Sequence, residues 1–127
     1  MKKIVTVLIF QLLMLAAPSF AQTSLEQRVL FQPDSVNIME SQEAQISMMA
    51  DYIKSHPNVT IIVAGFVSTL TNAQKADAIA QQRAENVSRY LTERCGVPSS
   101  RLVPIGVGIG KRYDQPEFNE VVSFFKK

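Results

Sequence analysis

The sequence predicts an α/β fold of the two-layer α+β sandwich type, with helices packed on one face of a mixed sheet. Three observations lead to this class. Segments rich in β-branched residues alternate with two segments of helical period, in the order β-α-β-α-β-β. The single cysteine, Cys95, excludes an intrachain disulfide, so an apolar core must hold the fold together. No internal repeat and no long polar linker divides the chain, which indicates one domain.

Residues 1–21 have the pattern of a secretory signal peptide. Two lysines precede an apolar stretch, residues 4–17, and small residues stand at the −3 and −1 positions of a cleavage site after Ala21. A retained membrane anchor is the alternative, but the apolar stretch is shorter than the roughly 20 residues of a spanning helix. We therefore expect the mature chain to be one domain, residues 22–127, with no transmembrane segment after cleavage.

The charge and the composition exclude several classes of function. Lys2 and Lys3 account for the whole formal net charge of +2, so residues 22–127 are neutral. A neutral domain lacks the basic field on which nucleic-acid binding depends, and no nucleic-acid partner is expected. His56 is the single histidine and Cys95 the single cysteine, so neither a metal cluster nor a Cys–His catalytic pair is expected. We expect no cofactor, no metal and no enzymatic activity.

The first half of the domain should contain one strand and one amphipathic helix. Residues 28–32 are the candidate strand. From Ile46 onward, apolar residues recur at i, i+3, i+4 and i+7, which places them on one face of a helix. The helix should stop just before Pro57, because the residue preceding a proline is disfavoured in helical geometry.

The second half should contain a strand, a helix and two further strands. Residues 59–65 are rich in β-branched side chains and predict a central strand, which a turn at 66–71 follows. A long helix is expected over residues 72–94. The stretches 102–107 and 117–125 are predicted to be the last two strands.

Arg83 lies on the apolar face of this second helix. At about 100° per residue, it falls within roughly 40° of Ile79 and on the same side as Val87. A guanidinium on a buried face is costly unless an anion or several hydrogen-bond acceptors meet it. The helix therefore holds an internal partner for Arg83 or presents Arg83 to a ligand.

Several motifs together resemble the OmpA-like, peptidoglycan-associating domain found in outer-membrane proteins and in peptidoglycan-associated lipoproteins. The resemblance extends from about Val29 to Phe125 without a gap between Pro33 and Gly108. It implies the same fold and a non-catalytic binding protein that is located in the periplasm or is peripheral to the outer membrane. The matching positions are Pro33-Asp34-Ser35-Val36, Ile38, Ile46, Met49-Ala50, Ile53, Pro57, the strand 59–65, Ile79–Ala84, Val87, Tyr90-Leu91, Gly96-Val97-Pro98, Arg101-Leu102 and Gly106-Val107-Gly108.

The sequence departs from the family at the expected ligand site. In the family, an aspartate after the second strand takes the ammonium of diaminopimelate in the stem peptide, and the helix arginine takes its carboxylate. Here Arg83 is kept, but Ser68 stands where the aspartate would be. The family's asparagine-arginine-arginine-valine reads Asn119-Glu120-Val121-Val122. The resemblance implies a ligand-binding site formed by Arg83, Ser68, Thr69 and Asn119.

Two functions remain open on these residues. In the first, the protein binds the peptidoglycan stem peptide through the altered pocket. In the second, it no longer binds peptidoglycan and serves protein–protein interaction or envelope assembly, with Arg83 neutralised internally by Glu120 or by backbone carbonyls. On the second hypothesis, an exposed turn at Phe66 and Val67 offers an apolar contact to an envelope protein. The alternative is that this turn folds back on the core.

Overall fold

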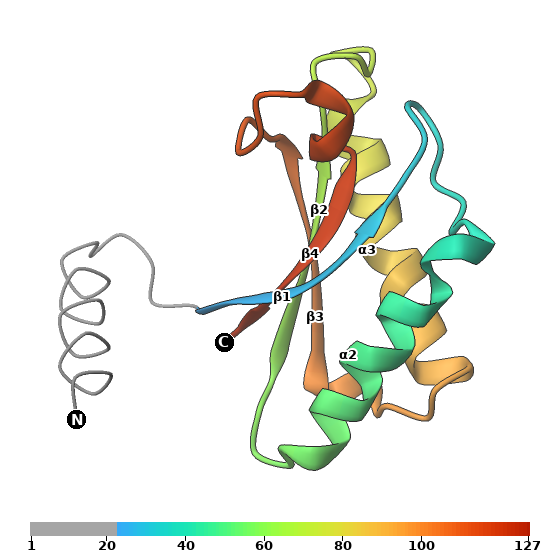
Figure 1. The fold of residues 1–127 in the computed structure, drawn as a ribbon, viewed down its shortest axis with the longest axis vertical. Coiled ribbons are helices and arrows are strands. Elements are labelled where there is room, and N and C mark those ends of the chain that lie inside the picture. Colours follow the sequence, from blue (N-terminus) through green and yellow to red (C-terminus); the bar gives the residue numbers. More distant parts are fainter. Residues whose placement is uncertain (1–22) are drawn as a thin grey trace, which may run out of the picture.

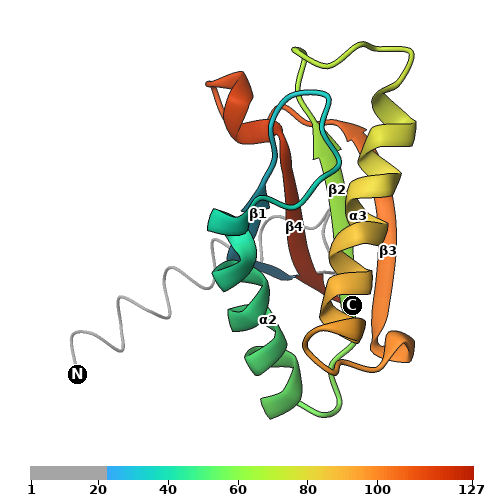
Figure 2. The same cartoon turned by 90° about the vertical axis from the view of Figure 1, so that its right-hand side faces the viewer.

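The computed structural model describes residues 23–127, which form a four-stranded sheet with two α-helices on one face (Figures 1 and 2). The predicted signal peptide, residues 1–21, lies outside the described residues. The elements along the chain are β1 (Thr23–Leu30), the short 3₁₀ helix η1 (Glu40–Gln42), α2 (Glu43–Ser55), β2 (Ile61–Val67), α3 (Ala76–Glu93), η2 (Ser99–Arg101), β3 (Leu102–Ile109), η3 (Pro116–Asn119) and β4 (Val121–Lys126).

The sheet is mixed and its strand order is β1-β4-β2-β3. β2 and β3 run parallel and are joined by α3, which makes a βαβ unit. β4 lies between β1 and β2 and is antiparallel to both. The predicted class, a two-layer sandwich with the order β-α-β-α-β-β, is confirmed.

The core lies between the sheet and the two helices. The apolar face predicted for the first helix is confirmed, because the four buried residues of α2 are those at i, i+3, i+4 and i+7 from Ile46. They pack in one cluster with side chains from every strand, among them Val29, Val63, Leu102 and Phe124. Among the described residues, no helix combines the length and the apolar character that crossing a membrane requires.

Gly65 brings α3 against the middle of the sheet. A Cβ built on Gly65 would lie 2.0 Å from the carbonyl oxygen of Ala80, so only glycine allows this approach. Arg83 and Ala84 follow within one turn of the helix. The close contact therefore fixes the depth at which Arg83 enters the interior.

The last strand was predicted over residues 117–125, and this prediction is wrong for residues 117–120. Pro116 opens the 3₁₀ helix η3, and the strand begins only at Val121. Proline fixes its own φ and has no N–H, which suits the first turn of a helix and not the start of a ladder. As a consequence, Glu120 lies at the junction of η3 and β4.

Other element ends also differ from the prediction. β1 begins at Thr23 and ends at Leu30, whereas residues 28–32 were expected. α3 begins at Ala76 instead of residue 72. β2 continues through Val67, which pairs with Ile109 and is fully buried, so the exposed turn, one of the two alternatives left open for Phe66 and Val67, is wrong. Pairing with β3 draws both residues into the sheet, and Val67 packs against Ala76 and Ala80 in a second core cluster.

Candidate functional site

Arg83 is completely buried, as its position on the helical wheel predicts. It is the largest of the fully buried side chains among the described residues. α3 directs it toward the end of β2, the segment after β1 and the segment before β4. These three segments come from distant parts of the chain and supply all the partners described below.

Four of the five N–H groups of the Arg83 guanidinium donate to acceptors of the protein. Its Nε donates to the carbonyl of Ser35 at 2.7 Å, and its Nη2 donates to the carbonyl of Gln32 at 2.9 Å. Its Nη1 donates to the carbonyl of Phe66 at 2.8 Å and to Oε1 of Glu120 at 2.7 Å. The ring of Phe31 adds a cation–π contact, with the guanidinium carbon 4.9 Å from the ring centre. Arg83 therefore needs no external ligand.

Glu120 is the anionic partner of Arg83 and is also fully buried. Its Oε2 accepts a hydrogen bond from Ser68 Oγ at 2.5 Å and one from Thr71 Oγ1 at 3.1 Å. Its backbone carbonyl accepts from the N–H of Phe31 at 2.8 Å, which fixes the residue at the start of β4. The carboxylate is thus held by one cation and two hydroxyls.

The pair remains charged at neutral pH. Burial lowers the pKa of Arg83, and the hydrogen bond and charge of Glu120 oppose that shift. Burial by itself raises the pKa of Glu120, but hydrogen bonds from Ser68 and Arg83 outweigh burial and hold this pKa below its ordinary value. The site is therefore an internal ion pair between a guanidinium and a carboxylate.

The structure brings together two of the four expected site residues. Ser68 is buried and shares the Glu120 carboxylate with Arg83. Thr69 is exposed at the turn that follows Ser68. The Asn119 amide bonds to the backbone of Tyr113, donating at 3.0 Å and accepting at 3.1 Å, and so holds the loop that leads into η3.

Sequence reasoning did not identify five of the groups around the ion pair, which are the carbonyls of Gln32, Ser35 and Phe66, the ring of Phe31 and the hydroxyl of Thr71. The carbonyls of Gln32 and Ser35 act through the backbone, so no side-chain pattern marks them. Thr71 left a signal, because the resemblance to the OmpA family aligns it with a glycine of that family, and the Thr71 hydroxyl donates to Glu120. A search for polar residues replacing small ones near the turn would have found it.

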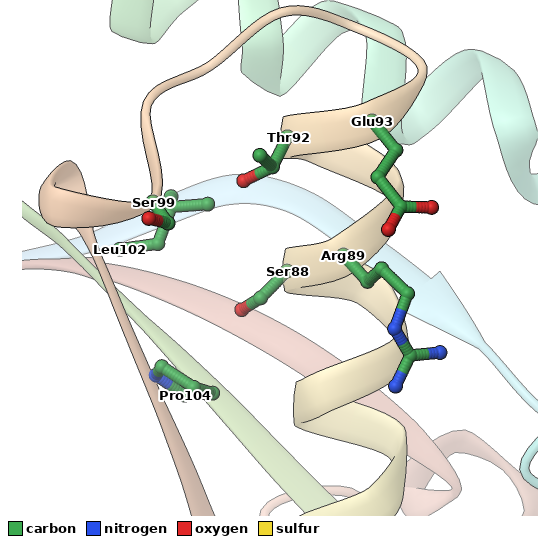
Figure 3. A pocket seen from close by; sticks show the side chains of 7 residues that line it. All are labelled: Ser88, Arg89, Thr92, Glu93, Ser99, Leu102 and Pro104. Atoms are coloured by element: carbon green, nitrogen blue, oxygen red, sulfur yellow. The ribbon is translucent and has the colours of Figure 1, made fainter.

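Two hollows along the second half of α3 lie away from the ion pair, and neither is lined by Arg83 or Glu120. The first, of about 230 Å³, lies between α3 and β3 (Figure 3). There the hydroxyls of Ser88 and Thr92 point toward the side of Leu102 and Pro104, whereas the Arg89 guanidinium points away from them (Figure 3). The second, of about 250 Å³, opens between α3 and the segment around Asn37. No group of three or more potential metal ligands occurs among the described residues.

A two-helix sandwich on a β1-β4-β2-β3 sheet, with an arginine of the second helix directed at the end of β2, defines an OmpA-like domain. The family model described as OmpA family matches residues 30–123. The chain belongs to the OmpA family, and the resemblance inferred from its motifs is confirmed.

Solved structures of several OmpA-like domains have the same fold. The peptidoglycan-associated lipoprotein from Burkholderia pseudomallei is 24% identical, with a TM-score of 0.70 over 80% of this chain and 91% of that one. The C-terminal domain of Helicobacter pylori MotB is 22% identical, with a TM-score of 0.69 over 81% and 85%. The OmpA-like domain of FopA1 from Francisella tularensis subsp. tularensis SCHU S4 is 16% identical, with a TM-score of 0.68 over 84% and 81%. A comparison with curated proteins finds no match.

Proposed function

We propose that the protein is a non-catalytic OmpA-like module, located in the periplasm or peripheral to the outer membrane, in which Glu120 fills the arginine site from within the protein. On this proposal, it does not hold a stem peptide at Arg83 and serves protein–protein interaction or envelope assembly. The observation that carries the proposal is the ion pair, in which both Arg83 and Glu120 are fully buried and satisfied by the protein itself.

The Glu120 carboxylate pairs with Arg83 in the way that a ligand carboxylate would. A bound carboxylate would have to compete with Glu120 for an N–H of Nη1, and backbone carbonyls already accept three other N–H groups of Arg83. The Ser68 hydroxyl supplies no charge for a ligand ammonium, and it already donates to Glu120. Entry of a ligand would have to separate two buried charges, and breaking a buried pair costs about 3–5 kcal/mol. A stem peptide would therefore bind weakly here.

The envelope location rests on two supports. The pattern of residues 1–21 is that of a secretory signal peptide. The chain is also similar in fold to a peptidoglycan-associated lipoprotein and to the OmpA-like domain of FopA1. Both supports favour a secreted domain whose partners are envelope components.

Sedimentation with purified peptidoglycan tests the proposal. The mature protein should stay in the supernatant, whereas the Burkholderia pseudomallei peptidoglycan-associated lipoprotein serves as the positive control. Walls of more than one stem-peptide chemistry should be used, because the altered pocket would favour an unusual one. Retention of the mature protein with any of these walls, at the level of the control, would contradict the closed-site proposal.

A second candidate function is stem-peptide binding through the altered pocket. One observation favours it, because Ser68 and Arg83 converge on a single carboxylate and would offer a ligand carboxylate the same two partners if Glu120 withdrew. On this hypothesis the mature protein is retained by peptidoglycan, and Ser68→Ala and Thr69→Ala reduce retention without unfolding the domain. Asn119→Ala should reduce it as well. Retention that is insensitive to all three substitutions would reject this site.

A further inference from the structure

The two outer strands of the sheet, β1 and β3, each have one side without a neighbouring strand. Figure 2 shows them at opposite sides of the sheet, with the two helices in front. Unpaired N–H and C=O groups on such an edge are a template for a strand from another chain. At each edge of this sheet, the side-chain oxygen of a glutamine from a helix accepts a hydrogen bond from a backbone N–H of the edge strand.

On the β3 edge, the N–H of Gly106 donates to Gln81 Oε1 of α3 at 2.7 Å. The Nε2 of Gln81 donates in turn to Glu85 Oε2 at 3.0 Å, which orients the amide so that its oxygen faces the strand. A Cβ on Gly106 would lie 2.6 Å from the backbone nitrogen of Gln81, so glycine is required for the contact. Pro104 lies two residues earlier and has no N–H. N–H groups two residues apart face the same side of a strand. The free edge of β3 therefore has no available N–H at two successive outward positions, 104 and 106.

On the β1 edge, the N–H of Leu30 donates to Gln42 Oε1 of η1 at 3.0 Å. The next N–H, that of Phe31, donates to the carbonyl of Glu120 on the β4 side. Successive N–H groups of a strand point to opposite sides, so the Leu30 donor faces the free edge. A register shift between Ser24 and Arg28 further interrupts this edge.

We infer that Gln42 and Gln81 are edge caps that close both sides of the sheet to strand addition. The protein then neither takes up an extended peptide as a fifth strand nor pairs edge to edge with a second copy of itself. The cap on β3 is the more important one. β3 contains no charged residue, and it exposes Ile105, Val107 and Ile109, so it lacks the charges that normally protect an edge. This inference is independent of whether Arg83 binds a ligand.

Amide hydrogen exchange measured by NMR tests the caps directly. Gln81→Ala should accelerate exchange of the Gly106 N–H by about 2- to 10-fold, the factor expected for one lost hydrogen bond of about 0.5–1.5 kcal/mol. Gln42→Ala should do the same at Leu30. The matched controls are Gln82→Ala, whose amide bonds to Asn86 in α3, and Gln45→Ala in α2. Unchanged exchange at Gly106 and Leu30 in the two cap variants would refute the caps.

Sedimentation velocity tests the consequence for association. The double variant Gln81→Ala/Pro104→Ala restores two outward donors on β3 and should self-associate with rising protein concentration. The wild type and Gln82→Ala/Pro104→Ala should show less association at every concentration. Circular dichroism checks that all three proteins are folded. If the folded double variant associates no more than its control, the caps do not guard the edge and the inference is wrong.

Discussion

At the scale of single residues, the central feature is the buried Arg83–Glu120 pair. The family places an anion after β2 and a cation on α3, and this chain keeps the cation while moving the anion to the start of β4. Ser68, at the position of the missing aspartate, hydrogen-bonds to the relocated carboxylate. The charge balance of the site is restored inside the protein, with no need for a ligand.

Glu120→Ala should lower the free energy of unfolding by about 3–5 kcal/mol, because it leaves a buried guanidinium without its anion. Thermal and urea unfolding followed by circular dichroism measure the loss. The control is Glu117→Ala, an exposed carboxylate on η3. A change in stability as small as that of the control would show that the backbone carbonyls alone satisfy Arg83.

The contribution of Glu120 should depend on pH. Its pKa is held below the ordinary value of 4.5, so the unfolded chain takes up the proton more readily than the folded one. The stabilisation is therefore fully present above that value and is lost as the pH falls through the lower pKa of the folded state. Glu120→Gln should be less stable than the wild type at neutral pH, and the difference should shrink in acid. Urea titrations across this range measure it, and a constant difference would contradict the ion pair.

At the scale of elements, the contact between α3 and β2 determines how deeply the arginine is inserted. Gly65 lies against the Ala80 carbonyl, and the two helices cover one face of the sheet (Figure 2). The loop before β4 then brings Glu120 to the same point. The site therefore depends on the distance between a helix and a strand as well as on its own side chains.

Gly65→Ala should destabilise the domain by about 1–3 kcal/mol, as overpacking does, because its Cβ would overlap the Ala80 carbonyl. The shift of α3 should also lengthen the Arg83–Glu120 contact. Gly110→Ala is the matched control, since the nearest atom to its Cβ is in the ring of Phe66 at 3.0 Å. Urea unfolding of the two variants gives the comparison, and equal stabilities would show that α3 can move away at no cost.

At the scale of the whole molecule, the chain has the OmpA fold, and it holds a buried Arg83–Glu120 ion pair where the family resemblance implies a ligand site. Ser68→Asp alone would place a second carboxylate beside Glu120, and like charges in a buried site are unfavourable. The pair of changes Ser68→Asp/Glu120→Arg instead returns both positions to the family's residue types.

Ser68→Asp/Glu120→Arg should therefore gain retention by peptidoglycan, which the wild type should lack. Ser68→Asp alone should gain none and should lower the melting temperature. Co-sedimentation and thermal unfolding of the three proteins measure both effects. If the folded double variant is not retained, then residues beyond these two positions also separate this chain from peptidoglycan-binding members.

The sequence by itself determined the fold class, the family and the exceptional position of Arg83. Helical and strand periods depend on neighbouring residues, so α2 and the core face of α3 could be predicted from spacing alone. The candidate pair of Arg83 with Glu120 could also be named from the sequence, though not distinguished from a ligand-bound arginine. Only the tertiary structure shows that the internal pair is formed. It brings the carbonyls of Gln32 and Ser35, the hydroxyl of Thr71 and the carboxylate of Glu120 to one point from three separate segments, and such backbone and long-range contacts leave no periodic trace in the chain.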